Sequence, residues 1–266
     1  MAHHPSGDYA PFADCPLSNP ATDLCILGQT ASGKLSIGKK LIPIAKTITL
    51  QGGVHEDRAT EQQEFIGAEG GATFSRVPLL IPGGPFEIAA PKSLPGFVQE
   101  IFNEFVDGKA TGLTATTEFA APASAVAIDT QDLAEAKGRG LSLPVKIKLS
   151  NPLLGESCYI GSNADPIAIP LTTGTTGPSA LHKSIKGKPG HAHFKDEYNL
   201  VTIAGDSLVN DSFPAPRASG CGGLLSFLVD PAINADLGLP VAAGGNEAIL
   251  NGTLRDANAP AVKASE

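Results

Sequence analysis

Glycine and proline are spread along the whole chain, and no other feature constrains its fold as strongly. The 266 residues include 30 glycines and 22 prolines, which interrupt helices and favour turns. Short runs of β-branched or alternating residues lie between them. In the run LPVKIKLS, for example, Val145, Ile147 and Leu149 face one way and two lysines the other. Many short strands without helical segments between them predict an all-β fold, an antiparallel β-sandwich or a barrel-like structure.

One segment departs from this pattern and predicts an amphipathic helix over residues 94–107. Phe97, Ile101 and Phe105 recur at helical spacing, and Gly108 supplies a stop signal. We expect this helix to close one end of the β fold. Contact with a membrane surface is the alternative, which the acidic polar face of the helix disfavours.

The length of the chain suits one large β domain or two smaller ones, and we favour a single β-rich domain over residues 1–266. Within it we expect an exposed N-terminal segment, about residues 1–23. The stretch 172–197 is rich in Gly, Lys, His and Pro and predicts a long exposed loop. The last residues, about 256–266, predict a frayed tail.

Four cysteines indicate the compartment in which the chain works. Cys15, Cys25, Cys158 and Cys221 form no CxxC pair, and no histidine is spaced for a zinc site. Their even number therefore predicts two disulfides and export from the cytosol. Three connectivities are open, and we favour Cys15–Cys25 with Cys158–Cys221. Four free thiols in a cytosolic protein are the alternative.

The charge balance limits the classes of partner. With 27 acidic and 19 basic residues, the net charge is −8, which argues against nucleic acid or an anionic membrane surface. No apolar run reaches the roughly 18 residues of a membrane span. The first residues lack the basic and apolar regions of a signal peptide, so an exported form would be a mature chain.

The stretch GQTASGK, from Gly28 to Lys34, is close to a phosphate-binding loop. That loop requires Ser or Thr directly after the lysine, and here Leu35 follows. The next residues favour a strand over the helix that a phosphate loop requires. We therefore predict two strands around a turn at residues 31–33, and no nucleotide site.

The residues GDSL, from Gly205 to Leu208, resemble the nucleophile block of the GDSL esterases and lipases, which implies Ser207 as nucleophile. Such an enzyme requires a downstream histidine as base, and none follows His193. We therefore expect a tight turn in which Asp206 and Ser207 bond to backbone groups.

The sequence HAHFKDE places His191, His193 and Glu197 in a pattern that resembles the first metal motif of the cupins. The family's second motif is absent, because His193 is the last histidine of the chain. These three residues are weak metal candidates, and a solvated loop is the simpler interpretation.

Four longer stretches resemble a family of uncharacterised proteins secreted by high-GC Gram-positive bacteria. The resemblance implies export, disulfides and a cell-envelope or extracellular location, and it brings no catalytic residues. The stretches are SGDYAPFADCPLSNPATDLC, NPLLGESCYIGSNADPIAIPLTTGTT, DSFPAPRASGCGG and LGLPVAAGGNEAILNGTL.

Because no catalytic constellation is complete, we expect a non-enzymatic protein without a cofactor. The favoured function is that of a secreted, disulfide-stabilised β protein of the cell surface or extracellular space. It would be structural or adhesive, as a self-assembling homo-oligomer or a cell-envelope component. The alternative is a binding module for an apolar or carbohydrate ligand. A cupin-like metal protein or a hydrolase ranks third.

Overall fold

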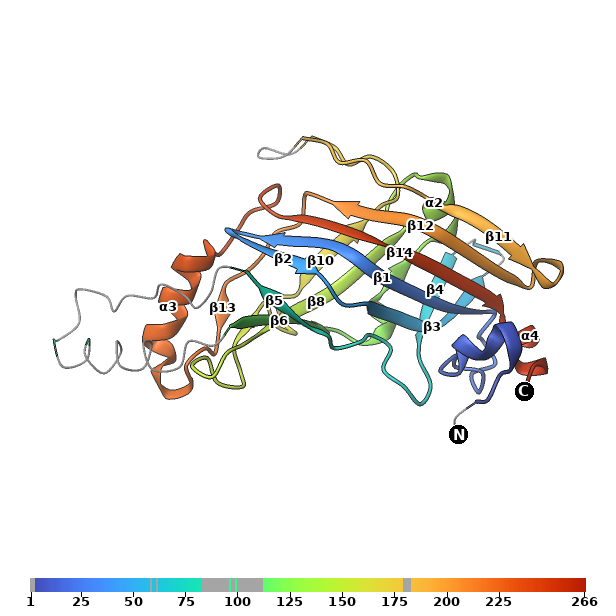
Figure 1. The fold of residues 1–266 in the computed structure, drawn as a ribbon, viewed down its shortest axis with the longest axis horizontal. Helices are drawn as coiled ribbons and strands as arrows, with labels where there is room; N and C mark the ends of the chain where they lie inside the picture. Colours follow the sequence, from blue (N-terminus) through green and yellow to red (C-terminus); the bar gives the residue numbers. More distant parts are fainter. Residues whose placement is uncertain are drawn as a thin grey trace.

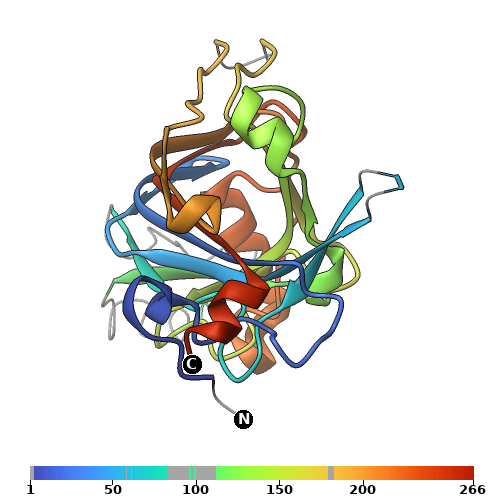
Figure 2. The same cartoon turned by 90° about the vertical axis from the view of Figure 1, so that its right-hand side faces the viewer.

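The computed structural model describes residues 3–57, 59, 60, 62–82, 96, 99, 112–178 and 183–266. Its strands form two antiparallel sheets that face each other (Figures 1 and 2). This arrangement confirms the predicted all-β, sandwich-like fold. The helix expected over residues 94–107 lies outside the described residues, apart from positions 96 and 99.

The first sheet has the strand order β11-β12-β14-β1-β3-β4, and β2 pairs with β1. Its long central strands are β1 and β14, which pair over almost their whole length. The strands are β1 (Leu24–Ile37), β2 (Lys40–Ile44), β3 (Ile48–Asp57), β4 (Gln62–Gly67), β11 (His191–Lys195), β12 (Leu200–Asn210) and β14 (Glu247–Asn258).

The second sheet has the order β13-β9-β8-β6-β5, and β7 and β10 also pair with β8. The strands are β5 (Pro78–Ile81), β6 (Leu113–Phe119), β7 (Ala127–Ile128), β8 (Leu141–Ser150), β9 (Tyr159–Ile160), β10 (Ile167–Leu171) and β13 (Ala218–Ser219).

Short helices connect the strands or cover the ends of the sandwich. They are η1 (Gly7–Phe12), η2 (Ala123–Ala125), α2 (Thr130–Glu135), η3 (Asp196–Tyr198), η4 (Gly223–Leu225), α3 (Ser226–Leu237) and α4 (Ala259–Ala264). Figure 1 shows α3 at one end of the molecule and both chain termini at the other. No helix in the described ranges is both long and apolar enough to cross a membrane.

The core lies between the sheets, and β8 shows how the sequence produces it. Buried and partly exposed residues alternate along this strand without exception. Val145, Ile147 and Leu149 are fully buried in the core, while Lys146 and Lys148 lie on the opposite face. The alternation predicted from the sequence is confirmed, because one face of the strand packs against the other sheet and one faces solvent.

Two β-bulges lie on either side of β14. The pairing of β1 with β14 shifts between Thr30 and Ser32, and that of β12 with β14 shifts between Ala204 and Asp206. The turn expected at residues 31–33 is therefore wrong, since β1 runs through this stretch as a single strand. The turn expected at Asp206 is wrong for the same reason, because an extra residue in a strand can be absorbed as a bulge.

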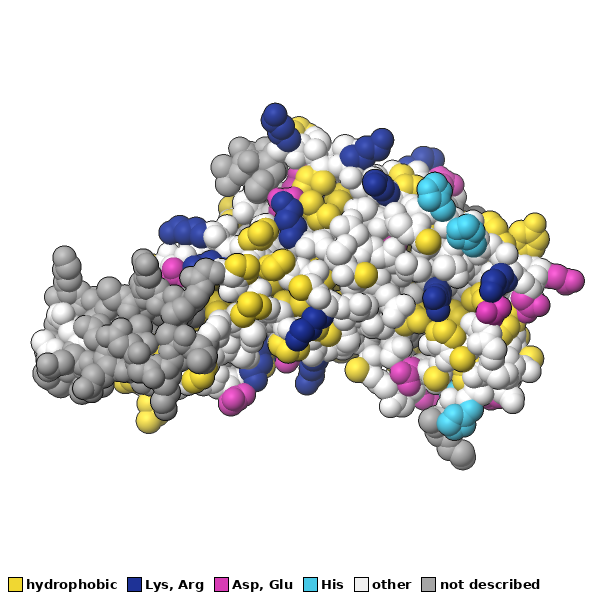
Figure 3. Space-filling view, in the orientation of Figure 1, with side chains coloured by type: hydrophobic (Ala, Val, Ile, Leu, Met, Phe, Trp, Pro, Cys, Tyr) yellow, Lys and Arg dark blue, Asp and Glu magenta, His cyan; other side chains and the backbone are white. Residues whose placement is uncertain are grey.

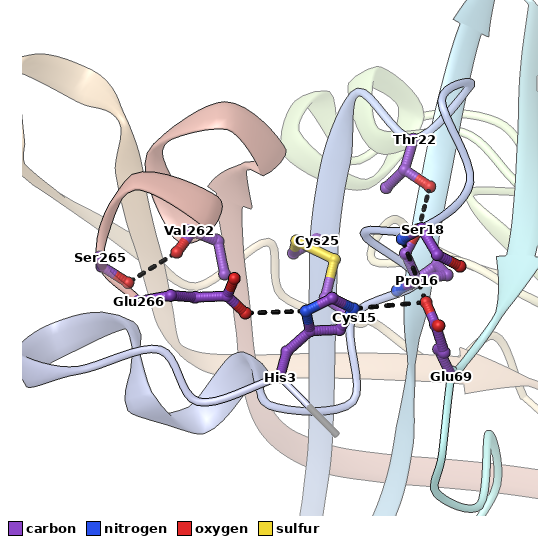
Figure 4. Close-up of a disulfide and its surroundings, with 10 residues drawn as sticks. All are labelled: His3, Cys15, Pro16, Ser18, Thr22, Cys25, Glu69, Val262, Ser265 and Glu266. Carbon is purple, nitrogen blue, oxygen red and sulfur yellow. Dashed lines mark hydrogen bonds and ion pairs between the residues drawn. A yellow bond between two sulfur atoms is a disulfide. The ribbon is translucent and has the colours of Figure 1, made fainter. Parts of the chain in front are cut away.

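The N-terminal segment packs on the outer face of the first sheet and is not an exposed arm. Phe12, Cys15 and Leu17 are buried in a small cluster with Cys25 and Leu27 of β1. Figure 4 shows the Cys15–Cys25 disulfide that fixes the segment to this strand. The expectation of an exposed segment over about 1–23 differs from the structure because the disulfide and the apolar side chains bring it onto the sheet.

The C-terminal residues also differ from the frayed tail expected over about 256–266. β14 continues to Asn258, and α4 buries Val262 in the same cluster as the N-terminal segment. The side chain of Glu266 contacts the ring Nδ1 of His3 at 2.7 Å, and the His3 ring also lies 3.5 Å from Glu69 (Figure 4). The two ends of the chain therefore stabilise each other.

The stretch 172–197 is more ordered than the long exposed loop expected. Its described residues form isolated bridges, Thr172 with Val209 and Lys188 with Ser207, and then strand β11. Backbone hydrogen bonds to β12 hold the segment along the edge of the first sheet. Low apolar content does not prevent such pairing, because the interactions are between main-chain groups.

Both predicted disulfides are confirmed, and none of the described cysteines is free. The Cys158–Cys221 bond joins residues 63 apart in sequence and anchors the region before α3 to the second sheet. Asp230 of α3 accepts a hydrogen bond from the Cys221 amide at 2.8 Å. Asn234 of the same helix bonds both backbone groups of Ala218 at 2.8 Å, which holds α3 against β13.

Candidate functional site

A cavity of about 120 Å³ lies between the two sheets. The first sheet contributes apolar side chains from β1, β3, β12 and β14, and the second contributes them from β5, β7, β8 and β10. Representative lining residues are Ile26, Leu50, Leu250, Leu143, Val145 and Ile169. Core side chains normally fill such space at the density of an organic crystal. A void of this size in an apolar core is therefore a candidate ligand site.

A glycine contributes to this space. Gly28 of β1 lines the cavity, and its position opposite Leu50 and Leu254 places it on the inner face of the first sheet. A Cβ atom at Gly28 would make only ordinary contacts, 3.7 Å from the Leu50 carbonyl oxygen and 3.9 Å from Leu254 Cδ1. The backbone of Gly28 therefore tolerates a side chain, and the glycine leaves room that another residue could fill.

Asp206 alone carries a charge among the described residues that line the cavity. It follows the bulge in β12 and lies opposite Gly252 of β14. Its Oδ1 atom is buried and has no hydrogen-bond partner among the described residues. Buried polar atoms are rarely left in this state, so the carboxylate is the most unusual chemical group of the cavity.

Burial raises the pKa of Asp206 to about 6, and its own backbone N–H opposes this effect in part. Taking a carboxylate out of water disfavours its charged form. None of the ion pairs formed by the described residues includes Asp206. At neutral pH the group is mostly ionised, and its charge is not compensated within the described chain.

A second acid, Asp256, lies on the same inner face but outside the cavity. It is opposite Ile26 of β1 and Val201 of β12, and burial raises its pKa to about 6. Since directly opposite residues in a sheet share a face, its side chain is directed inward beside Ile26. Asp256 therefore resembles Asp206 in its electrostatics and differs from it in not contacting the cavity.

The serine of the GDSL stretch is not arranged as a nucleophile. Ser207 lies within β12, and its Oγ donates a hydrogen bond to Asn251 Oδ1 at 2.8 Å. The adjacent Asp206, which the sequence placed in a turn, is the residue that reaches the cavity. The sequence signal for this residue is an acid directly after a glycine within a β-branched run. The GDSL resemblance indicates the neighbouring serine instead.

The weak metal candidates lie apart from the cavity. His191 and His193 are exposed on β11, the edge strand of the first sheet, and Glu197 is exposed in η3. Figure 3 shows histidine side chains at the surface over β11. No group of three or more His, Cys, Asp and Glu side chains in the described part of the chain has the arrangement of a metal site.

The lysine of the GQTASGK stretch is also away from the cavity. Lys34 pairs with Glu247 across β1 and β14 at 2.9 Å. Its ammonium group is therefore used in an ion pair at the surface of the sheet and not in a phosphate cradle.

A second, polar hollow of about 380 Å³ lies beside Arg139, Asn210 and Asp211. Its buried groups are matched to one another, since Thr176 Oγ1 donates to Asp211 Oδ2 at 2.7 Å and Ser212 N donates to Asn210 Oδ1 at 2.9 Å. None of the orphaned buried atoms in the described chain belongs to it. The inter-sheet cavity is therefore the stronger candidate.

Comparison of the chain with models of protein families, with curated proteins and with solved structures found no match. The site can therefore be interpreted only from its own geometry and chemistry.

Proposed function

We propose that this chain is a non-enzymatic binding protein that holds a small apolar ligand in the cavity between its two sheets. The cavity carries the proposal: it is an apolar space within the core, lined by side chains of both sheets. Such a space with few polar groups is the usual form of a site for small molecules.

The volume indicates the size of the ligand. An engineered cavity of about 150 Å³ with an apolar lining binds benzene. The present cavity, at about 120 Å³, is slightly smaller and accepts a ligand group about as large as a benzene ring. A single small ring or a short alkyl group therefore matches it better than a large lipid.

Toluene is a suitable probe, and the test compares two valine variants. Gly28→Val adds a side chain to the cavity at a position where a Cβ meets only ordinary contacts. Thr202→Val is the control, because Thr202 lies opposite Arg255 on β14, outside the cavity lining. Binding is measured from ligand-induced changes in NMR spectra and from the increase in thermal stability, which follows ligand saturation.

We expect toluene to bind the wild type and Thr202→Val with equal affinity and to lose binding to Gly28→Val. The Gly28→Val chain should be at least as stable as the wild type, because a strand glycine costs about 0.5–1 kcal/mol and the new side chain fills space. Absence of toluene binding to the wild type contradicts the proposal, as does equal binding to Gly28→Val.

We also propose that the protein functions outside the cytosol. The two disulfides support this location, because such bonds persist in oxidising compartments and are rare in the cytosol. Fractionation of producing cells tests it: the oxidised chain should appear in the extracellular or cell-surface fraction, and recovery of reduced chain in the cytosol would contradict it.

A self-assembling structural or adhesive role is the second candidate, and the edge strand β11 favours it. All five of its residues are exposed, and the rings of Phe194 and Tyr198 contact each other at the surface in a tilted arrangement with centroids 5.3 Å apart. An exposed strand edge can pair with another chain. Sedimentation of the wild type and of Phe194→Lys tests this: the role predicts oligomers that the variant loses, and monomers in both would overturn it.

A further inference from the structure

We propose that the ligand of the inter-sheet cavity carries a protonated amine, and that its ammonium group pairs with the carboxylate of Asp206. This inference rests on the proposed function and adds the chemical class of the ligand. It starts from a local feature of β12 that directs an acid into an apolar space.

The bulge in β12 is what places Asp206 in the cavity. Ile203 lines the cavity opposite Leu254, and in a regular strand alternate residues share a face. Gly205 would then face inward and Asp206 outward. The extra residue at Gly205, which has φ +73°, reverses this alternation and turns Asp206 inward. Bulges often redirect a side chain in this way near functional sites.

The space beside the carboxylate is free of competing side chains on the central strand. The residue opposite Asp206 is Gly252, which pairs on its other side with Thr30 of β1. Thr30 lines the cavity and carries no charge. The backbone of β1 lies close over Gly252, where a Cβ atom would clash with the Gln29 carbonyl oxygen. A polar group of a ligand therefore reaches the carboxylate from the cavity side, which Asp206 and Thr30 line, and displaces no side chain of β14.

The described basic residues on the neighbouring elements do not neutralise Asp206. On β1, Lys34 pairs with Glu247 of β14. Arg255 lies opposite Leu27 and Thr202, which places it on the outer face of the sheet. Lys188 pairs through its backbone with Ser207, and its side chain is exposed.

Among ligand groups, an ammonium best satisfies this environment. A hydroxyl could donate a hydrogen bond to the buried oxygen but would leave the negative charge unpaired, and a carboxylate would add like charge. An ammonium donates a charge-assisted hydrogen bond and neutralises the charge at once. The rest of the ligand would be apolar, as the lining requires.

Three probes with the same aromatic ring separate the contributions: toluene, and the isosteric pair benzyl alcohol and benzylamine. Their affinities are measured by calorimetry at neutral pH on the wild type, Asp206→Asn and Asp256→Asn. Asp256 is the matched control, because it is a partly buried acid on the same inner face, its pKa is also raised to about 6 by burial, and it does not line the cavity. Circular dichroism checks that each variant is folded.

We expect the wild type and Asp256→Asn to bind benzylamine at least about tenfold more tightly than benzyl alcohol, as a hydrogen bond to a charged group would provide. Asp206→Asn should lose this preference and keep its toluene affinity. The wild type should also lose the preference near pH 4.5, where Asp206 is protonated. This second measurement needs no variant.

The outcomes distinguish the two proposals. Absence of toluene binding overturns the cavity as an apolar ligand site. Toluene binding without a preference for benzylamine in the wild type overturns only the amine inference. A preference that persists in Asp206→Asn, or that Asp256→Asn removes, also overturns it, because the carboxylate responsible would not be that of Asp206.

Discussion

The partly buried carboxylate of Asp206 should make the free energy of unfolding depend on pH, and a single substitution should remove this dependence. The ordinary pKa of an aspartate carboxyl group is 3.8, and that of Asp206 is about 6 in the folded chain. Between these values the folded chain binds more protons than the unfolded chain, so the free energy of unfolding falls as the pH rises. The destabilisation is complete above about pH 6, and Asp206→Asn abolishes it because asparagine does not titrate.

The size of this effect follows from the two pKa values. Their difference, at about 1.4 kcal/mol for each pH unit, sets an upper limit of about 3 kcal/mol. The carboxylate is only partly buried, and solvent screening reduces its cost. We therefore expect Asp206→Asn to be about 1–2 kcal/mol more stable than the wild type at pH 7.5. Near pH 4 the gain should shrink to a few tenths of a kcal/mol.

Urea unfolding of both chains at several pH values between about 4 and 8 measures this difference. Asp57→Asn serves as a control of opposite sign, because hydrogen bonds from the Ala59 and Thr60 region lower the pKa of exposed Asp57. Its stabilising contribution is present above the unfolded pKa and is lost as the pH falls. A difference between the wild type and Asp206→Asn that is constant with pH, or that favours the wild type at pH 7.5, would refute the reasoning.

The remaining predictions concern what holds the fold together. Replacing Cys158 and Cys221 by alanine should lower the free energy of unfolding by about 4 kcal/mol, because the disulfide closes a loop with a sequence separation of 63. Replacing Cys15 and Cys25 by alanine should lower it by about 3 kcal/mol, because the separation is only 10. Denaturant titration checks both, and an equal or reversed order would contradict the loop-entropy argument. Ile147→Ala, at a fully buried position of β8, should cost about 2–5 kcal/mol. A loss below 1 kcal/mol would mean that this part of the core relaxes around the change.

The sequence was informative wherever local patterns determine the structure. The alternation along β8 predicts its buried and exposed faces, because a strand between core and solvent requires that pattern. The even number of cysteines predicts two disulfides, and the short separation of Cys15 and Cys25 favours their pairing. In each case the evidence lies in the residues themselves or in neighbours along the chain.

Features that depend on tertiary packing were not predictable in this way. Val262 and Phe12 read as parts of a loose tail and an exposed segment, yet both are buried in one cluster on the outer face of the first sheet. Both segments pack on the first sheet and on each other, and the Cys15–Cys25 disulfide also fixes the N-terminal segment. The cavity was equally hidden, since its lining comes from strands throughout the chain.

The two stretches that most resembled catalytic motifs mark the cavity for a different reason. GQTASGK and GDSL both contain small residues and glycine, which is why they resemble a phosphate loop and a nucleophile turn. In the structure each contains or adjoins a bulge, and the two bulges flank Gly252 of β14. Bulges favour such residues because one residue in the strand leaves the regular pairing. The bulge within the GDSL stretch turns Asp206 toward the cavity. The GQTASGK stretch contributes Gly28, whose missing side chain leaves part of the cavity volume unfilled. A motif that fails its chemical test can therefore still locate a site, because an irregular backbone in a long strand requires a structural or functional explanation.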